Sequence, residues 1–177
     1  EQTHCTRTML NNTILKVSDF CNQRECDNLI NCYRKYDGTG TKFYFIENPA
    51  FSKYEVENRK YFCSESITAL DQSVRSLIQK YYGIDVICKH GVRYSTYSKS
   101  PHVPWHHDQG TPNRFVTAIL HLTGTSEYVG GDFQFKDYSA PKLEKGDLII
   151  FPASYLHSVS PVTDGTRKTL IFYYEHY

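Results

Sequence analysis

Two histidines and one aspartate in this sequence have the residue types and spacing of a metal site. His106 and Asp108 lie two positions apart, and in an extended segment such side chains project to the same face, whereas His107 points away. A third donor, His157, follows a short apolar run. Two imidazoles and one carboxylate form the facial triad that suits non-haem Fe(II) and leaves three coordination positions open.

An arginine is expected beside this metal site. Asp164 and Gly165 form a pair that is typical of hairpin turns, and they lie between His157 and Arg167. We therefore predict a hairpin centred near Val162, with His157 and Arg167 at matching positions on its two arms. The guanidinium would then lie behind the metal, where it fits a carboxylate held by two hydrogen bonds.

A single histidine near a strand is more often structural or solvated than a metal ligand. The spacing of His106 and Asp108 is therefore weak evidence alone. The distal histidine, the arginine and the turn signal together make the prediction more specific. His157 is flanked by Leu156 and Val159 and is expected to be partly buried, where an imidazole needs a polar partner such as a metal.

Residues 13–174 resemble the Fe(II)/2-oxoglutarate-dependent oxygenases of the prolyl 4-hydroxylase and lysyl hydroxylase group. Several ordered motifs together carry the resemblance, and they are specific as a set. They are Val92-Arg93-Tyr94, His106-His107-Asp108, Arg114-Phe115-Val116-Thr117, Tyr128-Val129-Gly130-Gly131, Lys145-Gly146-Asp147 and the stretch from His157 to Arg167.

The resemblance implies a set of cofactors and the residues that bind them. His106, Asp108 and His157 would hold Fe(II), 2-oxoglutarate would chelate it and O2 would take the remaining position. The products would be succinate, carbon dioxide and a hydroxylated substrate, with ascorbate as the reductant. Arg167 would bind the distal carboxylate of 2-oxoglutarate. Collagen prolyl 4-hydroxylases usually have lysine at this position, whereas lysyl hydroxylases and several bacterial relatives have arginine. In this respect the chain resembles the second group.

The resemblance also suggests further residues in contact with 2-oxoglutarate. Tyr94 resembles the tyrosine that forms a hydrogen bond with the co-substrate in this group. Its spacing from His106 is slightly longer than usual, so Tyr97 is an alternative for the same role. Thr117 and His121 would project into the barrel by two-residue periodicity. His121 stands where relatives often have a co-substrate-facing tyrosine, and a core histidine with a structural role is an equally good interpretation.

The composition gives no reason to expect nucleic acid or a membrane as a partner. The chain has 177 residues, enough for one domain with a sizeable core. Lys and Arg number 20 against 19 Asp and Glu, so no strong overall field arises. The longest apolar runs fall short of the roughly 20 residues that a membrane helix needs.

Cysteines and one sequon bear on the compartment. The six cysteines lie in the first half, without the spacing of a zinc site, and their even number permits disulfides. Residues 11–13 form an Asn-Asn-Thr glycosylation sequon. These features favour the endoplasmic reticulum lumen or secretion over a cytoplasmic location, in which the cysteines would be small buried residues.

The elements that must position these residues begin with helices and continue with strands. Asn22 and Glu25 have the spacing of a capping box, and apolar residues recur at helical spacing over 66–82. About eight short strands follow, at 84–88, 92–97, 102–108, 115–122, 132–135, 147–151, 156–160 and 168–174. We predict a mainly β fold with flanking helices, a double-stranded β-helix (jelly-roll) core buttressed by N-terminal helices.

One domain is predicted for residues 1–177. It would comprise an N-terminal arm at 1–12, a helical support region at 13–83 and the jelly-roll core at 84–177. A strand at 42–47 is expected within the support region, and residues 48–61 give no clear period.

The leading functional hypothesis is a dioxygenase that hydroxylates a prolyl or lysyl residue of a peptide or protein. A second hypothesis has a free amino acid or other small charged molecule as substrate, which would need additional cations in the pocket, and Arg93 and Arg114 are candidates. A catalytically inactive jelly-roll binding module and a structural zinc protein are two further hypotheses. A structural zinc site usually takes four ligands, commonly cysteines, and the cysteines lie elsewhere.

Overall fold

The computed structural model describes residues 5–34, 41–44, 65–89, 91–99, 103–110 and 114–177. Its helices are α1 (Gln23–Arg34) and α3 (Glu65–Tyr82). Its strands are β1 (Arg7–Leu10), β2 (Ile14–Val17), β3 (Thr41–Tyr44), β4 (Val86–Ile87), β5 (Val92–Ser98), β6 (Val103–His106), β7 (Arg114–His121), β8 (Tyr128–Gly130), β9 (Phe133–Phe135), β10 (Leu148–Pro152), β11 (His157–Val159) and β12 (Val162–His176).

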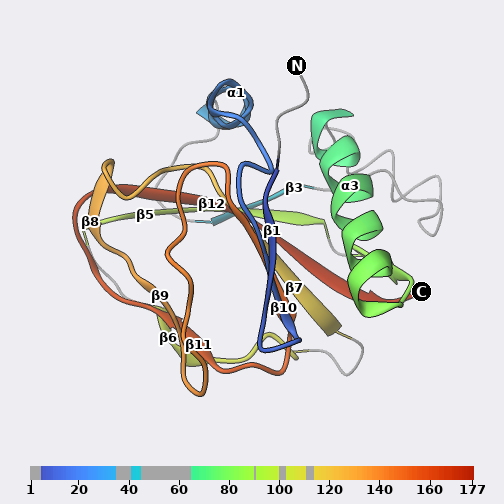
Figure 1. Cartoon of the computed structure of the whole chain (residues 1–177). Helices are drawn as coiled ribbons and strands as arrows, with labels where there is room; N and C mark the ends of the chain where they lie inside the picture. Colours follow the sequence, from blue (N-terminus) through green and yellow to red (C-terminus); the bar gives the residue numbers. More distant parts are fainter. Residues whose placement is uncertain (1–4, 35–40, 45–64, 90, 100–102, 111–113) are drawn as a thin grey trace.

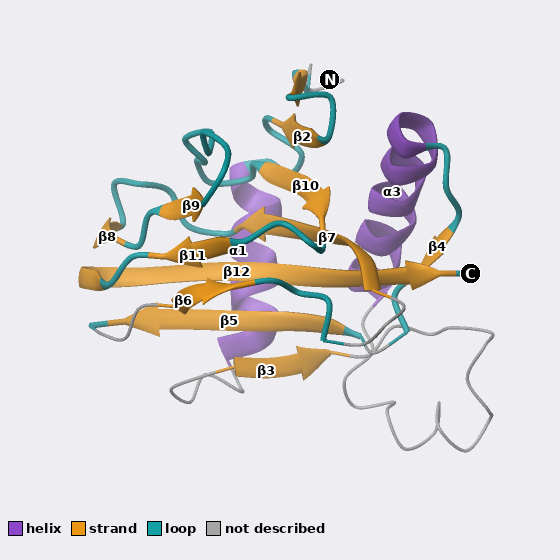
Figure 2. Ribbon diagram, turned by 90° about the horizontal axis from the view of Figure 1, so that it is seen from below, coloured by secondary structure: helices purple, strands orange, loops and turns teal. Residues whose placement is uncertain are grey.

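The strands form a large and a small antiparallel sheet that face each other. The large sheet has the order β1-β2-β10-β7-β12-β5-β3, and β4 and β8 also pair with β12. The small sheet has the order β6-β11-β9, and it overlies β5 and β12 in Figure 2. Phe133 and Phe135 of β9 pack on Phe151 of β10, with ring centroids 5.7 and 5.0 Å apart. The prediction of a mainly β fold with flanking helices is confirmed.

Two-residue alternation sorts the side chains of the large sheet onto two faces. On β10, Leu148 and Ile150 join the core that the helices cover, whereas Ile149 and Phe151 join the core between the two sheets. Figure 1 shows α3 along the first face, with the small sheet on the opposite side. Side chains that face the small sheet are therefore the ones available to a site inside the sandwich.

The helices begin and pack as their sequence indicates. Asn22 and Glu25 exchange hydrogen bonds of 2.7 and 2.9 Å between backbone N–H groups and side-chain oxygens, which is the predicted capping box. The buried stripe of α3 includes Ile67, Val74 and Ile78, each fully buried against the sheet. The helices therefore provide the apolar support of the large sheet.

The N-terminal segments extend the large sheet. Part of the predicted arm is β1, which pairs with β2, and β2 in turn pairs with β10. Asn11 and Asn12 make the turn between β1 and β2 in left-handed conformations, which asparagine tolerates. Residues 42–44 of the predicted strand at 42–47 belong to β3, and residues 45–47 lie outside the described residues. The predictions for residues 48–61 lie outside the described residues.

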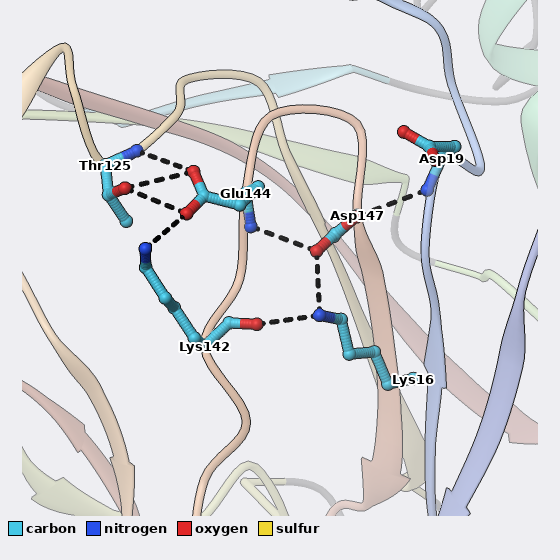
Figure 3. A network of polar contacts seen from close by, with 6 residues as sticks. All are labelled: Lys16, Asp19, Thr125, Lys142, Glu144 and Asp147. Carbon is cyan, nitrogen blue, oxygen red and sulfur yellow. Dashed lines mark hydrogen bonds and ion pairs between the residues drawn. The ribbon is translucent and has the colours of Figure 1, made fainter.

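A polar network fixes the loop that leads into β10 (Figure 3). The buried Asp147 carboxylate accepts hydrogen bonds from the backbone N–H groups of Asp19 and Glu144 at 3.2 and 3.0 Å, and pairs with Lys16 at 3.1 Å. Glu144 accepts from the Thr125 N–H at 3.1 Å. Since the backbone of residues 146 and 147 also bonds that of His121, the Lys-Gly-Asp motif holds the end of β7 in place.

The predicted hairpin centred near Val162, with its turn signal at Asp164 and Gly165, is wrong. The chain does turn between β11 and β12, but these strands belong to different sheets, so His157 and Arg167 are not on paired arms. Asp164 and Gly165 lie within β12 and pair with β8. Gly165 has φ +72°, and an added Cβ would overlap the carbonyl oxygen of Glu127. The glycine is thus required by the close approach of β8 at a bulge, rather than by a hairpin turn.

Gly165→Ala is therefore expected to lower the free energy of unfolding by more than about 2 kcal/mol, because the new methyl group meets backbone atoms that cannot move independently. The matched control is Gly83→Ala. Gly83 has φ +68° but no atom within 4 Å of the added Cβ, so only the conformational cost of about 1 kcal/mol applies. Urea denaturation of both variants measures the difference, and equal losses would contradict the role assigned to the contact with β8.

The cysteine prediction needs correction. Cys5, Cys21, Cys26, Cys32 and Cys88 are all free, and Cys63 lies outside the described residues. Three of them, at positions 21, 26 and 88, are buried in the helix-side core, where a thiol acts as a small apolar group. Burial raises the pKa of the first two of these thiols to about 12, so they stay protonated. Within the described residues the cysteines thus give no support to an oxidising compartment.

Candidate metal and co-substrate site

The three predicted metal-binding side chains meet between the sheets. His106 at the end of β6, Asp108 just after it and His157 on β11 each offer one ligand atom, and these atoms lie within 4.8 Å of one another. Nε2 of His106 lies 3.5 Å from Oδ1 of Asp108, and Nε2 of His157 lies 3.4 Å from Oδ2. β6 and β11 are paired neighbours with the two histidines in register, which brings their rings to 4.3 Å. His107, by contrast, is exposed.

Backbone carbonyl groups orient both imidazoles. Nδ1 of His106 bonds the carbonyl of Pro104, and Nδ1 of His157 bonds the carbonyl of Tyr155, each at 2.8 Å. A carbonyl only accepts, so in the neutral rings Nδ1 carries the proton and the lone pair is on Nε2. Both lone pairs therefore lie on the side of Asp108, which is the arrangement of metal-binding histidines with outer-shell partners.

Burial and mutual contacts set the charges of the cluster. Burial alone would raise the pKa of Asp108, but the hydrogen bond with His106 and the charge of a protonated His157 lower it overall. Burial lowers the pKa of His157, whereas contact with Asp108 raises that of His106. The ionised carboxylate and the neutral His157 are forms that coordinate a cation, whereas His106 would release its proton when a metal binds. The types of the three donors fit Fe(II).

Thr117 contacts the predicted ligand Asp108. Its hydroxyl donates to Oδ2 at 2.8 Å, and both side chains are buried. Thr117 therefore orients the carboxylate from β7, whereas the sequence suggests a contact with the co-substrate.

Thr117→Val is expected to weaken metal binding by about 10–100-fold, because the isosteric variant removes only this outer-shell hydrogen bond. Thr8→Val is the control, since Thr8 is exposed on β1. Titration of both variants with Mn(II), followed by electron paramagnetic resonance, gives the two affinities. Unchanged affinity in Thr117→Val would show that Asp108 needs no such support.

Arg167 and His121 form a buried pair deeper between the sheets. Arg167 is 2% exposed and His121 is 1% exposed, and Nη2 of the arginine donates to Nε2 of the histidine at 3.3 Å. Burial, followed by the charge of Arg167, lowers the pKa of His121 well below its usual value, so the imidazole is neutral. Among the described residues no carboxylate pairs with Arg167. A buried guanidinium of this kind is a fitting partner for an anionic ligand.

The structure does not place Tyr94 in the cavity of the metal cluster, whereas the alternative residue Tyr97 lines it. Tyr94 is buried in the core beneath the helices, on the face of β5 that points away from the metal cluster. Tyr97 lies three positions further, on the opposite face, with its ring centroid 5.8 Å from Cζ of Arg167. Odd-numbered residues of β5 face the small sheet, and this phase decides between the two tyrosines.

A cavity of about 200 Å³ connects the cluster with Arg167. It is lined by Arg93, Tyr97, Val103, Pro104, His106, Asp108, Ile119, His157, Val159, Arg167, Thr169, Ile171 and Tyr173. Thr169 and Tyr173 were not predicted, although they share the face of Arg167 by alternation along β12. Trp105, in contrast, lines a separate cavity of about 570 Å³ that also reaches His121.

The comparisons with known proteins agree with this geometry. The 2OG-Fe(II) oxygenase superfamily matches residues 92–175. A PKHD-type hydroxylase of Cupriavidus pinatubonensis is 36% identical over 70 residues, which cover 38% of this chain and 31% of the relative. One from Prochlorococcus marinus is 30% identical over 137 residues, covering 70% of this chain and 61% of the relative. The chain thus spans about a third to three fifths of these relatives.

Two solved structures share the fold. The viral collagen prolyl hydroxylase of Paramecium bursaria Chlorella virus-1 has a TM-score of 0.72 with full coverage of both chains at 17% identity. A Pseudomonas putida prolyl-4-hydroxylase has a TM-score of 0.65 at 16% identity and 94% coverage of each chain. In the described residues none of the helices is long and apolar enough to cross a membrane. Residues 92–175, which carry the His-Asp-His cluster and Arg167, belong to the 2OG-Fe(II) oxygenase superfamily.

Proposed function

We propose that the protein is an Fe(II)- and 2-oxoglutarate-dependent dioxygenase that hydroxylates a prolyl or lysyl residue of a peptide or protein and releases succinate and carbon dioxide. The observation that carries the proposal is one cavity with two functional ends. At one end His106, Asp108 and His157 converge, and at the other lies the buried Arg167 without a carboxylate partner among the described residues.

His106, Asp108 and His157 would hold Fe(II) on one face and leave three positions for 2-oxoglutarate and O2. Bound there, Fe(II) supplies the dioxygen chemistry that side chains lack. The chain's own contribution is to fix three donors in advance through the Pro104 and Tyr155 carbonyl groups and the Thr117 hydroxyl.

Arg167 would bind the distal carboxylate of 2-oxoglutarate by two parallel hydrogen bonds. His121 supports this role, since a neutral imidazole accepts from one guanidinium nitrogen and limits the rotation of the group. Ile119 and Ile171 contribute an apolar part of the cavity lining. An apolar wall strengthens each electrostatic contact inside the cavity.

The inactive binding module is the weaker hypothesis, because all three donors and Arg167 are present and preoriented. A small-molecule substrate is supported by a specific observation, namely that Arg93 lines the cavity of the metal cluster. Ascorbate would serve as the reductant that keeps the iron in the Fe(II) state.

Succinate formation tests the proposal. The protein is incubated with Fe(II), ascorbate, 2-oxoglutarate and a panel of proline- or lysine-containing peptides, and mass spectrometry records the gain of one oxygen atom. We expect substrate-dependent succinate that requires both Fe(II) and 2-oxoglutarate. Free amino acids are added to the panel as a second class of substrate. If no member of the panel raises succinate above the level of the substrate-free reaction, the binding module is favoured.

A further inference from the structure

Tyr173 carries a hydroxyl group that is held in place but has no acceptor for its own proton. The side chain is 7% exposed and lines the cavity of the metal cluster. Its oxygen accepts a long hydrogen bond, of 3.4 Å, from Nη1 of Arg93. Among the described residues no atom accepts the phenolic proton, and a tyrosine keeps that proton at neutral pH. The cavity therefore contains a buried donor that the protein itself does not use.

The ring of Tyr173 is held beside the predicted metal ligand Asp108. Tyr173 on β12 lies opposite Thr117 on β7, and the Thr117 hydroxyl donates to the Asp108 carboxylate. The Arg114 guanidinium lies 4.4 Å from the centre of the Tyr173 ring and donates to the Asp108 backbone carbonyl at 3.3 Å. These contacts place the ring at the metal end of the cavity, and none of them uses the hydroxyl proton.

Tyr173 lies on the closed side of the metal cluster. The His106 side chain is 39% exposed, so the cluster is open to solvent on that side. Arg167 and Tyr173 are both buried and project from the same face of β12 by two-residue alternation. A substrate from solution approaches over the open side, whereas the closed side belongs to the molecule that reaches Arg167. In the proposed function that molecule is 2-oxoglutarate.

The size of the cavity limits what can lie beside Tyr173. The cavity measures about 200 Å³. Pockets for drug-sized ligands measure roughly 300–1,000 Å³, so this one suits a small dicarboxylic acid and leaves little further room. The oxygen of Tyr173 accepts from a cationic group, which strengthens its O–H as a donor. A carboxylate is a strong acceptor for such a donor.

We propose that the Tyr173 hydroxyl donates a hydrogen bond to the carboxylate of 2-oxoglutarate that lies at the metal. The inference rests on the proposed function and adds a second anchor for the co-substrate, at the end opposite to Arg167. Tyr97 has a different place, since its ring lies near the Arg167 guanidinium. Anchors at both ends would fix the direction in which the 2-oxo acid enters the cavity.

The test uses Tyr173→Phe, which removes the hydroxyl and keeps the ring against Arg114. Isothermal titration calorimetry with the Mn(II)-loaded protein measures two probes, N-oxalylglycine and succinate. N-oxalylglycine has both carboxylates of 2-oxoglutarate and is not turned over. Succinate is one carbon shorter and lacks the carboxylate next to the keto group. A loss that affects only the first probe therefore isolates the contact with the metal-side carboxylate.

We expect Tyr173→Phe to weaken N-oxalylglycine binding about tenfold or more and succinate binding by less than about threefold. Arg167→Lys should weaken the binding of both probes, because both have the distal carboxylate. Tyr177→Phe is the control, since it removes a hydroxyl from a side chain that is 76% exposed. The Mn(II) affinity of Tyr173→Phe without a probe should be native, and thermal unfolding of each variant checks that it is folded.

An unchanged affinity of Tyr173→Phe for N-oxalylglycine would overturn the inference. Losses of equal size for the two probes would overturn it as well, because they would indicate a general distortion of the cavity. Either result leaves the proposed function intact if the native protein binds N-oxalylglycine in the presence of Mn(II). Absence of that binding in the native protein would instead contradict the proposed function itself.

Discussion

Replacing Asp108 with alanine is expected to abolish Fe(II) binding and all 2-oxoglutarate turnover, while the protein stays folded. Asp108 is 7% exposed and lies within 3.5 Å of Nε2 of both His106 and His157, so it is the only anion in the predicted ligand set. Loss of an outer-shell partner costs roughly 10–100-fold in metal affinity, and loss of the anionic ligand itself should cost more. His157→Ala is expected to have the same effect. Mn(II) titration and succinate formation measure the two losses.

His107→Ala is the matched control, because it removes an imidazole from the adjacent, exposed position. We expect most of the metal affinity and activity to remain. An equally large loss in His107→Ala would mean that the local strand register is shifted by one residue, which would exchange the two histidines between the inner and outer faces.

Arg167→Ala is expected to weaken 2-oxoglutarate binding strongly and leave metal binding intact. Truncating one partner of a buried charged pair costs about 2–5 kcal/mol, which corresponds to roughly 30-fold or more in the dissociation constant. Arg167→Lys should retain part of the affinity, since lysine supplies the charge without the paired donors. The KM for 2-oxoglutarate should therefore rise from the native protein to Arg167→Lys and further to Arg167→Ala.

The control for Arg167 is Arg7→Ala, which removes the same charge from an exposed position on β1. Its KM for 2-oxoglutarate should equal that of the native protein. Should Arg167→Ala also keep the native KM, the buried guanidinium would have a structural function instead, such as holding Tyr128 and His121.

The local part of the site could be predicted because it depends on short-range geometry. His106 and Asp108 face the same way through the two-residue period of an extended chain, whatever the rest of the fold does. The capping box of α1 and the apolar stripe of α3 are local in the same sense. Each of these predictions needs only neighbouring residues, and the structure contains all three.

The route by which His157 and Arg167 meet could not be predicted. The Asp164–Gly165 pair indicated a hairpin, but the glycine serves a close approach of β8 from a distant part of the chain. His157 lies in the small sheet and Arg167 in the large one. They share a cavity because the sheets pack face to face, and the pairing of strands far apart in sequence decides this.

The choice between Tyr94 and Tyr97 had a related difficulty. Both faces of β5 are covered, one by the helix-side core and one by the small sheet, so hydrophobicity does not tell which face is which. The phase of the strand is fixed by its pairing with β12, where Arg167 lies opposite Tyr97 and Leu170 opposite Tyr94. Only the register reveals which tyrosine shares a face with the arginine.

The most direct test of the central claim is an anaerobic titration of the protein with Fe(II) in the presence of 2-oxoglutarate, followed by visible absorption. Chelation of Fe(II) by a 2-oxo acid gives a charge-transfer band. We predict that the band saturates at one iron per chain, is absent in Asp108→Ala and needs a much higher 2-oxoglutarate concentration in Arg167→Ala. No band in the native protein, or a band of native strength in Asp108→Ala, would contradict the assignment of these residues.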